Sequence, residues 1–263
     1  QAFGPIFDGP GYGEDGCLWG GEVLVGGLTA CRRAAHLLYL PLPGGEQAIR
    51  EPWRQAMAAL ALALGGEALA ADAPTGLLPP GWELAWQGAE RGINTPLSSG
   101  MGRLFDAAAA LAGIGRRVNY EGQAAVELEQ LIDDGAAGAY AFELIPPEQP
   151  GAALILDWRP LIRSLREDLR QGLPIGALAV RFHRAVVDLC VAVCQRLRAE
   201  TGLELVLLSG GCWQNVWLLE QVWAALEADG FRVLGNSQVP ANDGGIAYGQ
   251  AAVAAARAAK GEI

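Results

Sequence analysis

Glycines stand beside carboxylate and amide side chains in three segments of this sequence: FDGPGYGEDGCLWGGE near the N-terminus, and SGGCWQN and PANDGG in the C-terminal third. Glycine lets the backbone come close to a ligand and can point N–H groups at an anion. The carboxylates of Asp8 and Asp243 suit hard cations, and the amide of Asn215 can donate and accept hydrogen bonds. Together the three segments predict a cleft for a nucleotide.

The first segment contains GYGEDG, which matches the G-x-G-x-x-G pattern of dinucleotide-binding turns. That pattern has to follow a strand and open a helix, whereas the next residues, CLWGGEVLV, are typical of a strand. We therefore expect a β-hairpin in which Phe7 ends one strand, GPGYGEDG forms the turn and CLWGGEVLV returns. Asp8 at the mouth of this hairpin could orient a polar ligand or a metal-bound water. The alternative is a glycine-rich hairpin without a ligand, because Gly and Asp are ordinary turn residues.

The other two segments each join a strand to a helix. Gly210 and Gly211 follow the buried strand LELVLLS and leave room for a ligand. Asn215 lies near the N-terminus of the next helix, where free N–H groups favour an anion. A structural strand-to-helix turn is the alternative. Asp243 lies at or near the start of the last helix, where it could bind a metal ion or a phosphate-bound water, or serve only as the helix N-cap.

The elements that must position these segments fall into three regions. Residues 1–45 have the pattern of short strands between glycine turns, residues 46–135 are mostly helical, and residues 136–263 alternate strands and helices. That alternation indicates a parallel α/β layer. In the helical region, IREPWRQAMAALALALGGE predicts one amphipathic helix that ends at glycines, and SSGMGRLFDAAAALAG predicts another that its serines can cap.

Composition limits the class of protein. The 263 residues are 51% hydrophobic and can form one large domain or two small ones. With 19 Lys and Arg against 29 Asp and Glu, the formal net charge is −10, so we expect no nucleic-acid partner. We find no signal peptide and no apolar run of about 18 residues, and we expect a soluble chain with no membrane partner. Five cysteines without a CxxC pair indicate free thiols in a reducing cytoplasm, and an initial Gln indicates a fragment or a processed chain.

Seven segments carry a resemblance that runs in order along nearly the whole chain. They are FDGPGYGEDGCLWGGE, PLPGGEQAIREPWR, SSGMGRLFDAAAALAG, NYEGQAAVELE, FHRAVVDLC, LSGGCWQN and VPANDGGIAYGQAAVA. They resemble the C-terminal part of the HypF family, the carbamoyltransferases of nickel–iron hydrogenase maturation. The SGG-x-x-x-N and NDGG pieces are shared more widely with the TsaD-like family of the actin/hexokinase (ASKHA) superfold. The resemblance implies an α/β fold, namely an ASKHA (actin/hexokinase-like, RNase H-like) lobe of a TsaD-like domain with a helical insertion, of which residues 1–263 are the C-terminal part.

The resemblance also implies an activity. HypF-like proteins use carbamoyl phosphate and ATP to make carbamoyl-adenylate. The TsaD-like domain then transfers the carbamoyl group to the C-terminal cysteine thiolate of the partner HypE, on the way to the cyanide ligands of the hydrogenase iron. The acceptor thiol would belong to the partner, so none of the chain's own cysteines is needed as a nucleophile. Two alternatives stay open: a non-catalytic remnant that docks a maturation partner, and an ASKHA-type small-molecule kinase.

Site roles follow from the resemblance, segment by segment. Asp8, Gly9 and Gly11 would line the phosphate side of the nucleotide, and Gly210, Gly211 and Asn215 would hold its adenosine end. Asp106 would hydrogen-bond the ribose, and Gly122 would pack close to the nucleotide. Asp243 would be a carboxylate ligand of a divalent metal (Fe, Zn or Mg) that contacts the phosphates, and Asp8 and Asp243 would be the catalytic residues. As alternatives, Asp106 could be a solvated helix residue and Glu121 a helix cap.

Some positions depart from the family pattern. The remaining metal ligands of the family are histidines of a segment that precedes the hairpin, outside this chain. His36 and His183 are therefore expected to be structural. Pro10 and Cys17 stand where threonines are expected, and Val216 where an Arg is expected, which puts the phosphate contacts in doubt. The acylphosphatase-like, zinc-finger and YrdC-like domains of HypF-like proteins are absent from this sequence.

Overall fold

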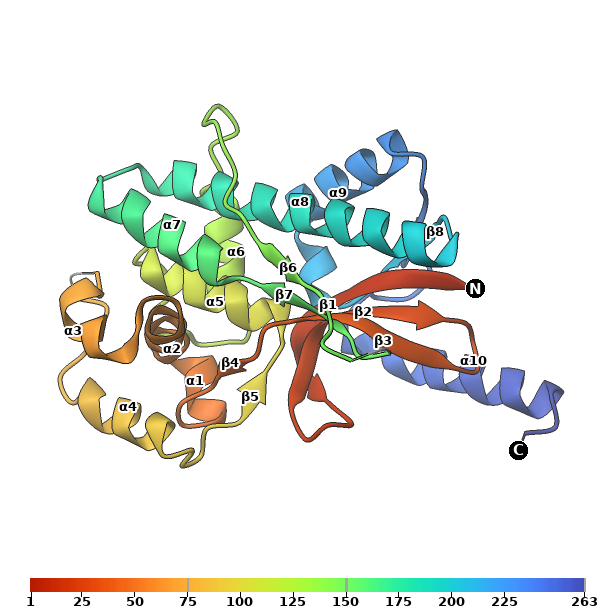
Figure 1. Ribbon diagram of the computed structural model, residues 1–263, viewed down its shortest axis with the longest axis horizontal. Coiled ribbons are helices and arrows are strands. Elements are labelled where there is room, and N and C mark those ends of the chain that lie inside the picture. The colour runs from red at the N-terminus through yellow and green to blue at the C-terminus, as the bar shows by residue number, and fades with distance from the viewer. Residues whose placement is uncertain (75, 150, 263) are drawn as a thin grey trace.

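The computed structural model describes residues 1–74, 76–149 and 151–262, which form a mixed nine-stranded sheet with helices on both faces (Figure 1). Seven strands follow the order β6-β7-β3-β2-β1-β8-β9, and β4 and β5 pair with each other beside β2. The strands are β1 (Ala2–Tyr12), β2 (Leu18–Gly26), β3 (Cys31–Leu37), β4 (Leu40–Pro41), β5 (Leu97–Ser98), β6 (Glu143–Ile145), β7 (Leu154–Asp157), β8 (Leu205–Leu208) and β9 (Arg232–Gly235). As expected from the strand–helix alternation, β8 and β9 are parallel, whereas β1 and β2 form the antiparallel hairpin.

The helices occupy the segments that the sequence pattern indicates. They are α1 (Glu46–Arg50), α2 (Trp53–Leu64), α3 (Leu69–Asp72), α4 (Trp82–Glu90), α5 (Met101–Leu111), α6 (Gln123–Gln130), α7 (Arg159–Arg170), α8 (Ile175–Thr201), α9 (Val216–Ala228) and α10 (Ile246–Ala259). Short 3-10 segments are η1 (Gly66–Ala68), η2 (Gly211–Gln214) and η3 (Asp243–Gly245).

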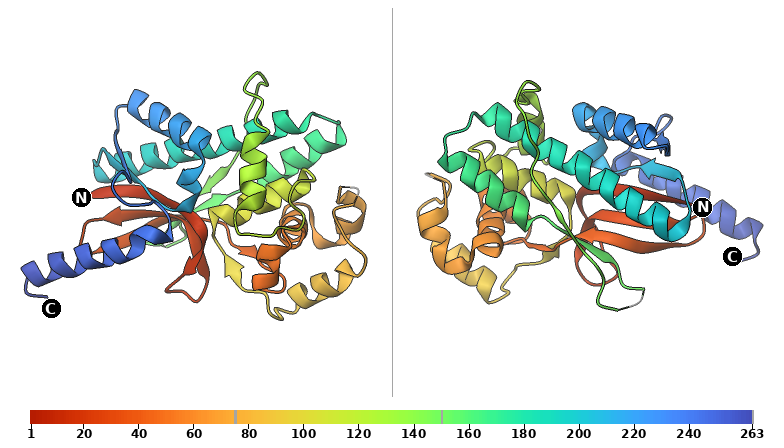
Figure 2. Two further views of the ribbon diagram at one scale, coloured as in Figure 1. Left: turned by 180° about the vertical axis from the view of Figure 1, so that it is seen from behind. Right: turned by 45° about the horizontal axis from the view of Figure 1, so that its top comes forward.

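The core lies between one face of the sheet and helices α5 and α7 to α9, and it continues between α5, α7 and the largely buried α2. Phe3 and Phe7 of β1 point to this face and are buried, and so are Val206 and Leu208 of β8. The helix α8 crosses the face with a stripe of buried apolar residues one turn apart, in agreement with the helical spacing in the sequence. On the opposite face, α10 extends beyond the edge of the sheet, and none of its 14 residues is buried (Figure 2).

Two helix expectations are wrong in detail. The segment expected to form one amphipathic helix breaks into α1 and α2 at Glu51 and Pro52, because proline has no N–H to donate but fits the start of a helix. The expected serine cap of α5 is also absent, since the N-cap is Gly100. Ser98 instead accepts a hydrogen bond from the Gly100 N–H at 3.0 Å, before the helix starts.

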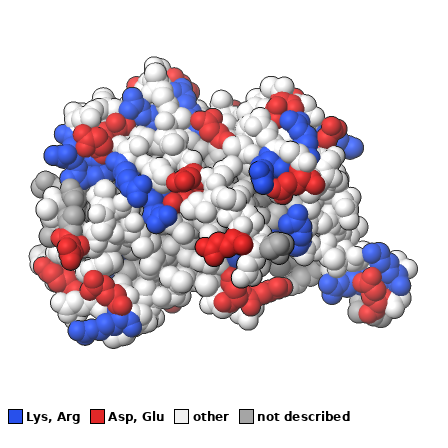
Figure 3. Space-filling view, in the orientation of Figure 1, with Lys and Arg blue, Asp and Glu red and all other residues white. Residues whose placement is uncertain are grey.

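Acidic and basic side chains are interspersed over the face that Figure 3 shows. Within the described ranges, no helix combines the length and the hydrophobicity needed to cross a membrane.

Candidate functional site

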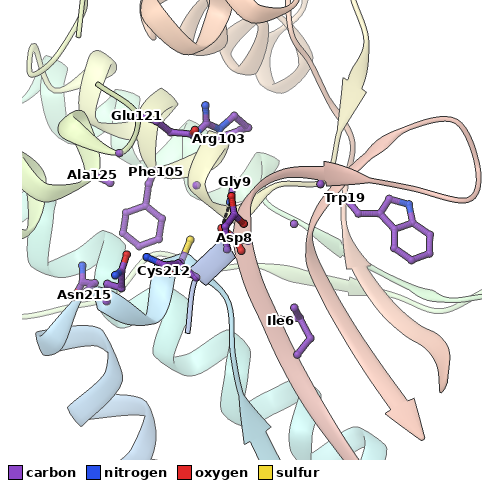
Figure 4. Close-up of a pocket in the computed structure, with 18 of the residues that line it drawn as sticks. Ile6, Asp8, Gly9, Trp19, Arg103, Phe105, Glu121, Ala125, Cys212 and Asn215 are labelled. Atoms are coloured by element: carbon purple, nitrogen blue, oxygen red, sulfur yellow. Dashed lines mark hydrogen bonds and ion pairs between the residues drawn. The ribbon is translucent and has the colours of Figure 1, made fainter. Parts of the chain in front are cut away.

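A cavity of about 690 Å³ lies where the β1–β2 hairpin meets α5, the start of α6, the η2 turn and the η3 turn (Figure 4). Seven of the residues expected at a site line this cavity: Asp8, Gly9, Gly11, Gly122, Gly211, Asn215 and Asp243. The structure therefore brings together all three glycine-rich segments, although Asp8 of the first and Asp243 of the third are more than two hundred positions apart in the sequence. Two expected residues, Asp106 and Gly210, do not line it.

An irregularity in β1 places Asp8 at the cavity. The expected turn is wrong in its boundaries, because β1 continues through Asp8 to Tyr12 and the register with β2 shifts between Phe7 and Gly11. Such bulges re-aim side chains. The Asp8 Oδ1 accepts a hydrogen bond from the Gly9 N–H at 2.8 Å, and the carboxylate points toward the η2 turn. A Cβ added at Gly211 would lie 2.8 Å from Asp8 Oδ1, so any side chain there would push the Asp8 carboxylate away from the η2 turn.

Gly210 has a packing role that differs from the expected ligand contact. Its φ is +110°, and a Cβ there would lie 2.2 Å from the Phe7 carbonyl oxygen. The glycine is therefore required by the close passage of the η2 turn over β1.

Asn215 ends the η2 turn and is the N-cap of α9. Its Oδ1 accepts a hydrogen bond from the Leu218 N–H at 2.8 Å, and its Nδ2 lies 2.9 Å from His183 Nε2. Phe105 of α5 lies beside Asn215 and Cys212 on the same wall (Figure 4). Asn215 thus combines helix capping with a position on the cavity wall.

Asp243 lines the cavity but is not the N-cap that its position suggested. The cap of η3 is Asn242, whose Oδ1 accepts a hydrogen bond from the Gly244 N–H at 3.1 Å. In the part of the chain that the structure describes, the Asp243 carboxylate is exposed and forms no hydrogen bond or ion pair. A capping role therefore does not explain this residue.

Asp106 lies behind the cavity wall, and neither its ribose role nor the solvated alternative matches its position. It is 2% exposed on α5, where the Arg103 guanidinium lies 3.3 Å from its carboxylate. Burial raises the pKa of Asp106 to about 6, against the opposing effects of Arg103 and Gln55. The reason is that α5 turns this side chain into the interior of the helical region rather than toward the hairpin.

Arg103 is a cavity residue that the sequence reasoning missed, and Glu121, which was considered only as a helix cap, also lines the cavity. Arg103 is 1% exposed, and its Nη2 lies 3.2 Å from Glu121 Oε1, while its Nε and Nη1 are buried without a hydrogen-bond partner among the described residues. Glu121 lies against Gly9, where a Cβ would approach Glu121 Oε1 to 2.6 Å. An arginine inside a helix whose other residues, apart from Asp106, are small or apolar was the available signal, because buried cations are rare without a specific role.

Glu22 is a second missed residue, and its contacts are structural. Its carboxylate accepts hydrogen bonds from the Gly20 and Gly21 N–H groups and pairs with Arg33 at 2.7 Å. Ser99 donates another hydrogen bond to it. These bonds fix β2 opposite the irregular part of β1, so Glu22 supports the wall that carries Asp8.

The cavity wall is acidic. Five carboxylates line it, from Asp8, Glu22, Glu121, Glu129 and Asp243, against the single cation of Arg103. Among the described residues, no group of three or more His, Cys, Asp or Glu side chains is placed to hold a metal ion. The residues present therefore do not make a metal site by themselves.

The remaining residues singled out in the sequence lie elsewhere. The side chain of Pro10 is outside the described part of the structure, and Cys17 and Val216 do not line the cavity. His36 lies on β3, where its Nδ1 contacts the Leu37 carbonyl at 2.8 Å. His183 is fully buried on α8 and contacts Asn215.

Comparisons with known proteins agree with this geometry. A family model described as "Carbamoyltransferase, Kae1-like Domain, second subdomain" matches residues 4–250. The chain is 37% identical to carbamoyltransferase HypF2 of Cupriavidus necator, covering 98% of this chain and 34% of that protein. It is 40% identical to carbamoyltransferase HypF of Rhodobacter capsulatus, covering 96% and 32%. The chain spans about a third of the length of these relatives.

Solved structures show the same fold. A crystal structure of full-length HypF in the phosphate- and nucleotide-bound form matches with a TM-score of 0.86 and 36% identity, over 97% of this chain and 39% of that one. A crystal structure of HypF from T. kodakarensis matches with a TM-score of 0.81 and 31% identity, over 96% of this chain and 34% of that one. The expected TsaD-like fold is therefore confirmed, and the chain belongs to the HypF carbamoyltransferase family, in which it corresponds to the second subdomain of the Kae1-like domain.

Proposed function

We propose that this chain supplies the nucleotide-binding wall of a carbamoyltransferase, which passes a carbamoyl group from carbamoyl-adenylate to the C-terminal cysteine of HypE in the cytoplasm. The observation that carries the proposal is the convergence of the hairpin, the η2 turn and the η3 turn on one cavity. Relatives that match nearly the whole chain are named carbamoyltransferases, which supports the reaction class.

The cavity suits a nucleotide in size and in backbone chemistry. Its volume of about 690 Å³ lies within the range of small-molecule and cofactor sites, roughly 300–1,000 Å³. Gly9, Gly11 and Gly211 present backbone without side chains along one side of it, so phosphate oxygens could come close to the main chain there, although the Gly9 N–H already donates to Asp8. Asn215 and Gly122 would contact the nucleoside end. The matching full-length HypF structure is described as nucleotide-bound, which supports this assignment.

The acidic lining favours a cation-assisted complex. Five carboxylates against one arginine would repel the phosphates of ATP unless a divalent cation stood between them. We assign Asp243 as one ligand of such an ion, because its carboxylate is exposed on the wall and is not used as a cap. The other ligands would come from residues outside this chain. Asp8, whose carboxylate lies next to Gly211, would orient the phosphate end.

The proposed chemistry is acyl transfer to sulfur. The HypE thiol loses its proton, and the thiolate attacks the carbamoyl carbon. The C–S bond forms as the bond from that carbon to the AMP oxygen breaks, and AMP leaves with the bonding electrons. The part of this chain is to hold the AMP portion in place, with Asn215 and the glycine turns orienting it so that the carbamoyl carbon stays accessible to the incoming thiolate.

Carbamoylation of HypE, followed by mass spectrometry of its C-terminal peptide, tests the proposal in the intact protein that carries this chain. With carbamoyl phosphate and ATP, the wild type should give the adduct, and Asp243→Asn should slow its formation by at least about tenfold. Asp188→Asn on α8 is the matched control, because Asp188 does not line the cavity. Phosphorylation of a small molecule without an adduct would favour the kinase, and the absence of ATP and AMP binding would favour a docking role.

A further inference from the structure

A chain of hydrogen bonds connects the interior of α8 to the cavity wall. His183 Nδ1 lies 2.7 Å from the Ala179 carbonyl oxygen, and His183 Nε2 lies 2.9 Å from Asn215 Nδ2. Asn215 Oδ1 in turn accepts from the Leu218 N–H at 2.8 Å. Of the four residues, Asn215 alone lines the cavity.

The partners determine where the protons lie. A carbonyl oxygen can only accept, so His183 Nδ1 carries the hydrogen and donates it to Ala179. In the neutral ring, Nε2 is then an acceptor, and the Asn215 amide donates to it. The ring is fully buried and packs edge-on against Phe105 and Trp217, and burial lowers the pKa of His183 to about 4, which keeps the ring neutral.

This arrangement leaves the Asn215 amide one orientation. If the amide were flipped, its oxygen would face the His183 Nε2 lone pair, and its NH₂ group would face the Leu218 N–H, so both hydrogen bonds would be lost. The cap alone would hold Oδ1, but the amide plane could still rotate about it. His183 supplies the second fixed point, so the nitrogen and oxygen of the amide keep defined places on the cavity wall.

We propose that His183 is a positioning residue of the nucleotide site, which acts by holding the Asn215 amide in one orientation. A ligand atom that meets Asn215 Nδ2 must then be a hydrogen-bond acceptor, such as a ribose oxygen or a purine ring nitrogen. The inference rests on the proposed function of the cavity as a nucleotide site. His183 itself touches no ligand, because it lies behind Asn215 and is fully buried.

AMP affinity measured by calorimetry in the intact protein tests the inference with a double-mutant cycle. His183→Phe keeps an aromatic ring in an aromatic surrounding but removes the acceptor, and it should weaken AMP binding about tenfold, as expected for the loss of one orienting hydrogen bond. Asn215→Ala should weaken binding at least as much. In the Asn215→Ala background, His183→Phe should then change the affinity less than about twofold. His183→Gln, whose amide oxygen can accept, should restore part of the loss.

His36→Phe is the matched control, because His36 is the other histidine of the chain, is not within the cavity lining and does not contact Asn215. A thermal melt shows that each variant is folded, and the histidine ¹⁵N shifts of the wild type should report a neutral ring protonated at Nδ1. If His183→Phe leaves AMP affinity unchanged, or lowers it equally with and without Asn215, the positioning role is overturned while the nucleotide site stands. If the wild type binds no nucleotide, the proposed function fails as well, and the two failures are distinct.

Discussion

The pH dependence of stability can decide whether burial or Arg103 controls the ionisation of Asp106. Asp106 is fully buried, and its pKa is raised from 3.8 to about 6, although the Arg103 guanidinium lies 3.3 Å away. Arg103 also forms an ion pair with Glu121, at 3.2 Å, and the negative charge of Glu121 opposes the lowering of the Asp106 pKa by Arg103. In the folded protein Asp106 therefore keeps its proton at pH values at which the unfolded chain has lost it.

The sign and size of the effect follow from proton linkage. Between about pH 4 and pH 6 the folded state binds more protons at this site than the unfolded state, so the free energy of unfolding falls as pH rises, and it stays lower above pH 6. A shift of roughly two pKa units at 1.36 kcal/mol per unit corresponds to about 3 kcal/mol. Below about pH 3 the carboxyl is protonated in both states and the penalty disappears.

Urea unfolding of the wild type and of Asp106→Asn, from about pH 4 to pH 7, measures this contribution. The asparagine does not titrate, so the difference in unfolding free energy between the two proteins cancels the other titrating groups. We expect the unfolding free energy of the wild type to fall by about 2.4 kcal/mol relative to that of the variant across this range. A difference that is flat, or that rises with pH, would show that Arg103 outweighs burial and would refute the reasoning.

Three further predictions concern the η2 turn, the β1–β2 hairpin and the acidic lining of the cavity. Gly210→Ala should destabilise the protein by about 3 kcal/mol or more, because the new Cβ would meet the Phe7 carbonyl oxygen. Gly249→Ala is the control: a Cβ there meets open space on α10, so the change should be neutral or stabilising by about 0.5–1 kcal/mol. Equal effects of the two substitutions in chemical unfolding would contradict this prediction. Glu22→Gln should cost about 1.5–3 kcal/mol in the same assay, because Arg33 loses its buried charged partner and keeps only the more exposed Asp15, at 2.9 Å. A loss under about 1 kcal/mol would mean that the hairpin does not depend on the Glu22–Arg33 pair. Chelation of divalent cations should weaken ATP binding by about tenfold or more, since the lining is acidic, and an affinity that calorimetry finds unchanged by chelation would argue against a cation in the complex.

Much of the site could be predicted from the sequence because its backbone requirements are local. Glycine beside a carboxylate or amide marks a turn that can approach a ligand, and this identified Asp8, Gly211, Asn215 and Asp243, all on the cavity wall. The resemblance added Gly122, which also lines it. Which of these residues bind a ligand, and the division into three regions, stay predictions.

Other positions could not be assigned from local pattern. Gly210 looks equivalent to Gly211 in the sequence, but one packs against β1 and the other lies on the wall. Asp106 and Arg103 are three residues apart on α5, yet only Arg103 reaches the cavity. The direction of each side chain depends on how α5 sits against the hairpin, and no spacing rule contains that information.

The sequence by itself determined the order of strands and helices, the glycine turns and the family, because hydrophobic periodicity and glycine conformations are properties of short segments. Only the tertiary structure decided that residues from β1, α5, η2 and η3 share one cavity, that its lining is acidic, and that the buried His183 contacts Asn215 across 32 positions of sequence. The physical reason is that such contacts arise from the packing of helices on a sheet, where burial and long-range hydrogen bonds are set by all the elements together.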